Sequence, residues 1–175
     1  MVVHNEWMPR AEWDALVKGE SCPMCSAIVS KEPFSEWNYT VADLDSGILW
    51  LRTNQYVRGY SVLVCRQHVR EPYQLKKHDR IQFFEDLMLV GEVLEKVYNA
   101  DKMNFEILGN STPHLHCHII PRYYGDPAPN QPMSLPFSEV VKLKPEEYIE
   151  QVKRIRDALF KKKSNSLRIQ NNQII

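Results

Sequence analysis

Hydrophobic residues in the first half of the chain follow the spacing of β-strands. The runs Tyr39–Asp43 and Ile48–Arg52 are rich in β-prone residues, and the connector 44–47 between them contains Asp and Gly. This pattern predicts a β-hairpin. The run Tyr60–Cys65 is apolar enough to predict a third strand in the middle of a sheet.

A helical spacing of hydrophobic residues follows these strands. It extends over about five turns and predicts one long helix. Its apolar positions are Ile81, Phe84, Leu87, Met88, Leu94 and Val97. Met103–Leu108 is then expected to form a strand, and a short loop leads to a last strand that is rich in histidine. Pro145 is expected to open a final helix that ends near Lys162, because proline favours the first turn of a helix.

These elements predict an α+β fold, in which an antiparallel sheet of about five strands combines with a long helix and a C-terminal helix. The length of 175 residues suits one domain, which we place at residues 1–162. Residues 1–38 are expected to be irregular or partly helical, with a short helix at Ala11–Lys18. The proline-rich stretch Tyr123–Pro136 is expected to form a loop. The polar residues 163–175 are expected to form a flexible tail.

Composition and charge exclude several classes of protein. Acidic and basic residues balance at 22 each, so no net charge attracts the chain to nucleic acid or to anionic lipid. No apolar run approaches the roughly 18 residues that span a bilayer, and the N-terminus lacks the apolar core of a signal peptide. Four cysteines are too few and too unevenly spaced for a disulfide scaffold. We therefore expect a cytoplasmic protein without a membrane or nucleic-acid partner.

Three histidines occupy alternate positions: His114, His116 and His118. Alternate side chains of a strand share a face, so the three imidazoles are expected on one side and Leu115 and Cys117 on the other. A neutral imidazole can act as a nucleophile, a general acid or a metal ligand near pH 7. A single histidine would indicate an ordinary surface residue, whereas three at this spacing indicate chemistry.

The segment His114–Ile120 resembles the signature of the histidine triad (HIT) superfamily, His-φ-His-φ-His-φ-φ, where φ is apolar. Cys117 takes one φ place as a small hydrophobic residue. The continuation Pro121-Arg122-Tyr123 is similar to the usual end of that strand, and residues from about 22 to 124 follow the family's order of elements. The resemblance implies a HIT-like fold, a small nucleotide as substrate and a two-fold homodimer.

A second motif is the Cys-x-x-Cys pair of Cys22 and Cys25. Alone it is a redox motif, half of a metal site or a chance pair, and the residues before it show no strand of the thioredoxin kind. The zinc-containing branch of the HIT hydrolases implies a structural zinc ion held by Cys22, Cys25, His68 and His114, with no open coordination position. The alternative is a reduced pair without metal, with His68 capping a turn.

The same resemblance assigns roles to the other two histidines. His116 would attack a nucleotide α-phosphate, and His118 would contact the phosphate or assist the leaving group. The preceding loop, with Asn110, Ser111 and Thr112, is expected to bind nonbridging phosphate oxygens. Asn110 stands where many relatives have Gln, whose side chain is one methylene longer. The substrate can therefore differ from that of those relatives.

The implied function is a hydrolase that cleaves a dinucleoside polyphosphate or a nucleoside phosphoramidate through a nucleotidyl-histidine intermediate. Asn54 resembles a ribose-contacting asparagine of some relatives, although its spacing from Gly59 is shorter. A nucleotidyltransferase or phosphorylase with the same intermediate is one alternative, and a nucleotide-binding scaffold with little turnover is another. The lack of a basic excess disfavours a role on adenylated DNA.

Overall fold

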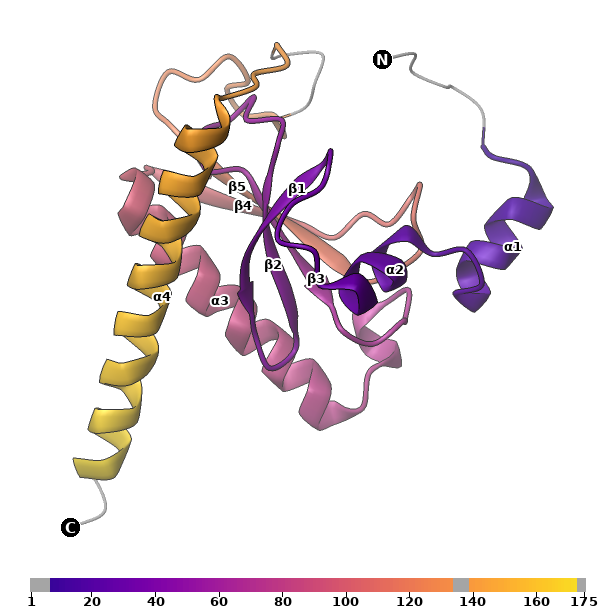
Figure 1. The fold of residues 1–175 in the computed structure, drawn as a ribbon, viewed down its shortest axis with the longest axis horizontal. Coiled ribbons are helices and arrows are strands. Elements are labelled where there is room, and N and C mark those ends of the chain that lie inside the picture. Colours follow the sequence, from indigo (N-terminus) through magenta and orange to yellow (C-terminus); the bar gives the residue numbers. More distant parts are fainter. Residues whose placement is uncertain (1–6, 134–138, 173–175) are drawn as a thin grey trace.

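Five antiparallel strands form the centre of the structure, a computed structural model that describes residues 7–133 and 139–172, with side chains up to residue 164 (Figure 1). Their order across the sheet is β1 (Asn38–Asp43), β2 (Gly47–Arg52), β3 (Ser61–Cys65), β5 (His116–Arg122) and β4 (Lys102–Glu106). The sequence-based prediction of an α+β fold with a hairpin, a central third strand and a histidine strand is therefore confirmed.

One face of the sheet packs against the two long helices, α3 (Lys77–Tyr98) and α4 (Pro145–Asn172). The strand residues that are buried on this side include Leu49, Leu51, Leu63, Cys65, Cys117 and Ile119. Leu115 is buried in the same cluster. The predicted alternation along the histidine strand is thus correct, because its apolar side chains belong to the helix-covered core.

The opposite face carries a second apolar cluster around Trp50, Tyr60 and Val62. It is covered by Ile28 of helix α2 (Pro23–Ser30) at one end and by Met133 of the proline-rich loop at the other. The helix α1 (Arg10–Lys18) precedes α2, and a 3₁₀ turn at Pro72–Gln74 precedes α3. Helix α1 confirms the short N-terminal helix that the sequence predicts.

Helix α3 differs from its prediction in the residues that it buries. Ile81, Phe84 and Met88 belong to the predicted apolar set, yet they are 51%, 37% and 49% exposed. Phe83 and Val90, which lie outside that set, are fully buried. The helix is apolar on two sides, so hydrophobic spacing alone does not decide which side meets the sheet.

Helix α4 is longer than predicted. It ends at Asn172 instead of near Lys162, so the segment from Lys163 that was expected to be irregular is helical up to Asn172. Residues 173–175 lie outside the described part, and a flexible tail remains a prediction there. No helix in the described part of the chain is long and apolar enough to cross a membrane.

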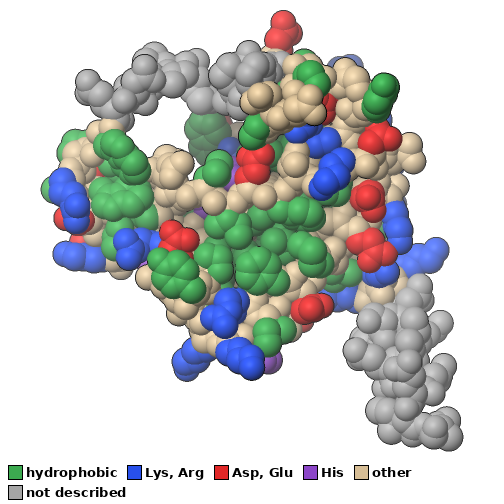
Figure 2. Space-filling model, turned by 180° about the vertical axis from the view of Figure 1, so that it is seen from behind, with side chains coloured by type: hydrophobic (Ala, Val, Ile, Leu, Met, Phe, Trp, Pro, Cys, Tyr) green, Lys and Arg blue, Asp and Glu red, His purple; other side chains and the backbone are tan. Residues whose placement is uncertain are grey.

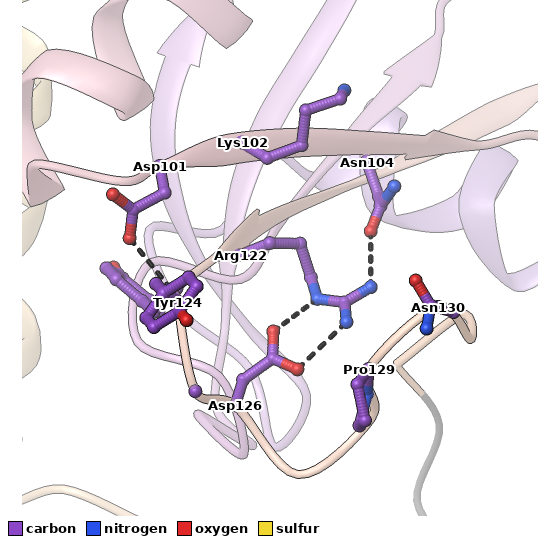
Figure 3. A pocket seen from close by; sticks show the side chains of 10 residues that line it. Asp101, Lys102, Asn104, Arg122, Tyr124, Asp126, Pro129 and Asn130 are labelled. Carbon is purple, nitrogen blue, oxygen red and sulfur yellow. Dashed lines mark hydrogen bonds and ion pairs between the residues drawn. The ribbon is translucent and has the colours of Figure 1, made fainter.

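Arg122, at the end of β5, holds the start of the proline-rich loop in place (Figure 3). Its guanidinium donates to both carboxylate oxygens of Asp126, at 2.6 and 2.9 Å. It also donates to Asn104 Oδ1 and to the backbone oxygens of Ala128 and Gln131. These bonds use all five N–H groups of the arginine. Arg122 is therefore fully partnered within the fold, beside a small pocket of about 390 Å³.

Candidate active site and metal cluster

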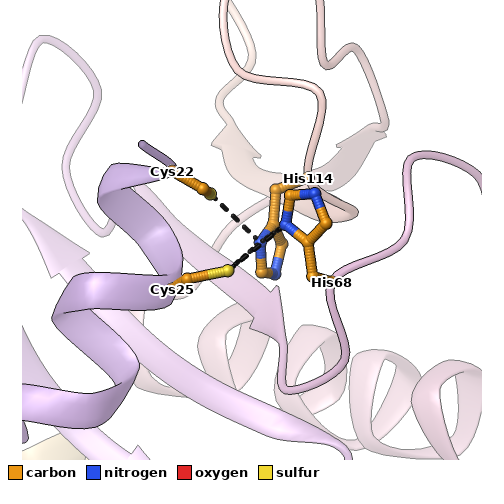
Figure 4. Close-up of side chains that lie close together, drawn as sticks. All are labelled: Cys22, Cys25, His68 and His114. Carbon is orange, nitrogen blue, oxygen red and sulfur yellow. Dashed lines mark hydrogen bonds between the residues drawn. The ribbon is translucent and has the colours of Figure 1, made fainter. Parts of the chain in front are cut away.

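The structure brings the four predicted metal ligands together, although they come from three distant segments (Figure 4). One ligand atom from each of Cys22, Cys25, His68 and His114 lies within 4.8 Å of the others. Nδ1 of His114 is 3.4 Å from Cys22 Sγ, 3.5 Å from Cys25 Sγ and 3.2 Å from Nδ1 of His68. Cys25 Sγ is 3.2 Å from His68 Nδ1.

These separations match a tetrahedral metal site. Bonds of about 2.3 Å to sulfur and 2.0–2.1 Å to nitrogen separate neighbouring ligand atoms by roughly 3.3–3.8 Å. The donor set of two thiols and two imidazoles suits a metal ion such as zinc. The protein can supply all four ligands of the tetrahedron, which is typical of a structural metal site and leaves no open position for a substrate.

The second nitrogen of each imidazole supports the same interpretation. Nε2 of His114 lies 2.7 Å from the backbone oxygen of Cys65, and Nε2 of His68 lies 3.0 Å from that of Val17. A carbonyl oxygen only accepts, so each Nε2 carries a proton and each Nδ1 is the nitrogen that can offer a lone pair to a metal ion. The two Nδ1 atoms point toward each other, as two ligands of one ion would. The cluster can therefore bind a metal ion.

Burial has a clear effect on the titrating groups of this cluster. Desolvation, together with the neighbouring Cys22, raises the pKa of the Cys25 thiol to about 11. Desolvation also lowers the pKa of His114 to about 4, and hydrogen bonding to Cys65 opposes that shift. The imidazole is thus neutral near pH 7 and ready to coordinate, whereas the thiol has to release its proton when a metal binds.

His116 is buried at the start of β5 and is oriented by its own strand. Its Nδ1 donates to the backbone oxygen of His114 at 2.6 Å. This bond fixes the tautomer in which Nε2 has a free lone pair. Burial lowers the pKa of His116, and the charge of Arg52 adds to that effect. Near pH 7 the ring is therefore neutral and can act as a nucleophile.

His118 lies next to His116 on the same face, with ring centroids 5.0 Å apart. The hydroxyl of Tyr60, the residue just before the adjacent strand β3, lies 2.6 Å from its Nδ1. Burial lowers the pKa of His118 to about 4, and the nearby charges of His116 and Arg52 lower it further in the same direction. Tyr60 is a site residue that the sequence did not indicate.

A pocket of about 470 Å³ opens in front of the two histidines. Ser111 and Thr112, from the loop before the triad, line it, and their contact with phosphate oxygens stays a prediction. Its remaining wall comes from α2, from the segment between α2 and β1, and from strands β1 to β3: Pro23, Met24, Ala27, Ser35, Trp37, Asn38, Trp50, Arg52 and Val62. The indole rings of Trp37 and Trp50 offer flat apolar surface of the kind that bases of nucleotides stack on.

Two predicted nucleotide contacts are not brought to this pocket. Asn54 lies outside the described lining, and its Oδ1 accepts a hydrogen bond from the backbone N–H of Val141 at 3.1 Å. Asn110 is exposed and also lies outside the lining. On the β1–β2 side, the pocket instead contains Asn38 and Arg52, whose side chains are joined by a 2.7 Å hydrogen bond.

Comparison with known proteins agrees with this geometry. Residues 40–125 match the family model described as HIT domain. An uncharacterised HIT-like protein of Methanocaldococcus jannaschii is 27% identical over 109 residues, which cover 60% of this chain and 81% of that protein. A bis(5'-adenosyl)-triphosphatase of Saccharomyces cerevisiae is 30% identical over 102 residues, which are 55% of this chain but only 46% of that enzyme.

Solved structures show the same fold. A Zn-bound histidine triad family protein from Mycobacterium smegmatis superposes with a TM-score of 0.61. The alignment covers 83% of this chain and 98% of that one, at 17% sequence identity. At this identity the likeness establishes the shared fold.

Proposed function

Because the chain belongs to the histidine triad (HIT) family, we propose that it hydrolyses nucleotides at the α-phosphate through an intermediate on His116. The observation that carries the proposal is the 2.6 Å hydrogen bond from His116 Nδ1 to the backbone oxygen of His114. It leaves Nε2 as the free nitrogen in a pocket that also contains the loop residues Ser111 and Thr112. This arrangement combines a fixed nucleophile with hydroxyl donors for phosphate oxygens.

The reaction proceeds in two displacements at phosphorus. The Nε2 lone pair of His116 forms a bond to the α-phosphorus, and the bond to the leaving group breaks. The leaving group takes its electron pair and gains a proton from solvent, while the neutral His118 can assist it by donating a hydrogen bond. A water oxygen then attacks the same phosphorus and releases a proton to solvent, the P–N bond breaks, and its electron pair returns to Nε2. The products are a nucleoside monophosphate and the neutral His116.

The substrate class that we propose is a dinucleoside polyphosphate or a nucleoside phosphoramidate. The yeast relative, described as a bis(5'-adenosyl)-triphosphatase, supports the first of these. Trp37 and Trp50 in the pocket wall support a planar base as one end of the substrate.

Phosphorus NMR of a substrate panel tests this function. Diadenosine polyphosphates or adenosine phosphoramidate should yield a monophosphate without added inorganic phosphate. His116→Ala should lower kcat at least about 1,000-fold, since the nucleophile is lost. Turnover that requires added phosphate or a sugar phosphate would identify a transferase. Near wild-type turnover by His116→Ala would refute the assignment of the nucleophile.

For the metal cluster we propose one structural zinc ion held by Cys22, Cys25, His68 and His114. Zinc would supply a cross-link between α2, the turn after β3 and the catalytic strand. Elemental analysis of the purified protein should show about one zinc per chain. Cys22→Ser should lower this content, whereas Cys65→Ala, at a buried cysteine outside the cluster, should not. Equal metal content in both variants would contradict the proposal.

We also propose a homodimer, built on the exposed apolar side chains of α3 and β4. Ile81, Phe84, Met88 and Phe105 are all more than one third exposed, and hydrophobic side chains gather in the middle of the face shown in Figure 2. A monomer rarely exposes a large continuous apolar patch. Sedimentation should give a dimer for the wild type and a monomer for Met88→Glu. Ile149→Glu, at an exposed apolar position of α4, should remain dimeric.

A further inference from the structure

Arg52 is the only charged side chain in the described lining of the candidate active site, because the lowered pKa values of His116 and His118 leave both rings neutral near pH 7. It is the last residue of β2 and pairs with Asn38 of β1 across the hairpin. Trp50, two residues earlier on the same strand face, lies opposite Val62, which in turn lies opposite His118. Arg52 therefore belongs to the triad face of the sheet.

No carboxylate in the described part of the chain forms an ion pair with this charge. The described lining of the pocket contains no Asp or Glu, and none of the ion pairs among the described residues includes Arg52. Its neighbours are neutral: Asn38 Oδ1 accepts from one terminal nitrogen at 2.7 Å, and the Tyr60 ring centroid lies 6.0 Å from the guanidinium carbon. The cation thus faces a pocket with no anion among the side chains that line it.

The hydrogen bonds of Arg52 are also incomplete. Its Nε is buried and has no acceptor within the described part of the chain. Leaving a buried donor without a partner is costly, and for a charged group more so. Arg122 shows the contrast, because all five of its N–H groups are used within the fold. The fold provides acceptors for every N–H group of Arg122, whereas the buried Nε of Arg52 has no acceptor in the described part of the chain.

The backbone of Arg52 lies on a different strand, two positions across the sheet from that of His116, which would attack the phosphate. Strands β2 and β5 are not neighbours, since β3 lies between them. With about 4.8 Å between adjacent strands, their backbones are roughly 10 Å apart. Ser111 and Thr112 belong to the segment leading into β5, on the side of His116. The pocket therefore has polar groups at two places, one on the side of the catalytic strand and one on the hairpin.

We propose that Arg52, held by Asn38, forms a second anion subsite, so that the preferred nucleotides carry a second phosphate besides the one that His116 attacks. The proposal deepens the proposed function and rests on its assignment of the attacked phosphate. A guanidinium recognises phosphate oxygens through paired N–H donors, and a fixed arginine suits this task better than a flexible lysine. The second phosphate is either the next one in a polyphosphate chain or one attached to the ribose.

Calorimetric titration of the metal-loaded wild type with unreactive nucleotides tests the subsite. The ligands are AMP, α,β-methylene-ADP, adenosine 2',5'-bisphosphate and adenosine 3',5'-bisphosphate. At least one ligand with two phosphates should bind about 10-fold more tightly than AMP. A gain with the methylene compound assigns the subsite to the phosphate chain, and a gain with a bisphosphate assigns it to the ribose.

Variants then decide whether Arg52 causes the gain. In Arg52→Gln the advantage over AMP should fall below about 2-fold, while the affinity for AMP itself stays within about 3-fold of the wild type. Arg52→Lys should keep part of the advantage, and it provides the measurement if Arg52→Gln does not fold. Arg58→Gln, at an exposed arginine outside the described pocket lining, should keep all of it.

Three results would overturn the inference. The first is a wild type that binds all four ligands equally. The second is a gain that survives in Arg52→Gln. The third is an equal loss of affinity for AMP and for the other ligands, because Arg52 would then hold the attacked phosphate. None of these measurements involves turnover, so they test the subsite independently of hydrolysis. If the wild type does not hydrolyse nucleotides but Arg52→Gln loses the tighter binding of two-phosphate ligands, the proposed function is refuted and the subsite is supported.

Discussion

His118 should make the stability of the protein depend on pH. Burial, and then the charges of His116 and Arg52, lower its pKa from 6.5 to about 4 in the folded chain. Between these two values the unfolded chain binds more protons than the folded chain. The contribution of His118 is therefore fully present above pH 6.5 and is lost as the pH falls toward 4.

The size of the effect follows from the two pKa values. Each pH unit inside that interval changes the free energy of unfolding by about 1.4 kcal/mol for one titrating group. Acidification from pH 7 to pH 5 should thus remove roughly 2 kcal/mol that depends on His118. His118→Gln cannot titrate, so the stability difference between wild type and variant should shrink by this amount over the same interval.

Urea unfolding, followed by tryptophan fluorescence, measures the difference in unfolding free energy between wild type and His118→Gln at pH 7 and at pH 5. Wild type and variant share the same Cys and His cluster, so acid-induced changes at that cluster cancel in the comparison. His78→Gln, at an exposed histidine, controls for the loss of an imidazole. A difference between wild type and His118→Gln that is the same at both pH values would refute the reasoning, because His118 would then titrate alike in the folded and unfolded chains.

Three further outcomes are expected. Gly47→Ala should prevent folding or strongly lower Tm in thermal scans, because the new Cβ would lie 2.0 Å from the backbone oxygen of Val64; a Tm like the wild type would contradict this. Arg122→Ala should cost about 3 kcal/mol in urea unfolding, since it leaves the largely buried carboxylate of Asp126 without its cation; Arg122→Lys should recover only part. Removing metal with a chelator should lower Tm and weaken AMP binding, and added zinc should restore both; unchanged values would speak against a bound ion.

The parts of the fold that the sequence predicts well are those set by local spacing. The hairpin depends on two adjacent β-prone runs and a short turn, and the alternation of His114, His116 and His118 follows from strand geometry alone. The buried side of α3 could not be predicted in this way. Ile81 and Phe83 are both apolar, and only the position of the sheet decides which of them is covered.

The sequence likewise indicated some residues of the site and not others. The four metal ligands were indicated by a family resemblance, and the structure brings them together. The rest of the pocket wall was not predicted, because its residues come from four separate stretches between positions 23 and 62. Arg52, at the end of a strand, belongs to no sequence motif that would indicate a functional role. Its interpretation depends on the lack of a carboxylate among the described residues that line the pocket, which is a property of the folded chain.

Helix α2 connects the metal cluster to the pocket. Cys25 points to the cluster, whereas Met24 and Ala27 line the pocket. A helix of eight residues is too short to be stable alone, and Ile28 is its one residue that is buried as far as the structure describes it. A metal bound at the cluster would therefore add to the packing of Ile28 and help to fix the place of α2. The same cross-link would hold His114, whose backbone oxygen orients His116. A metal that takes no part in the reaction would thus still affect both the shape of the pocket and the orientation of the His116 ring.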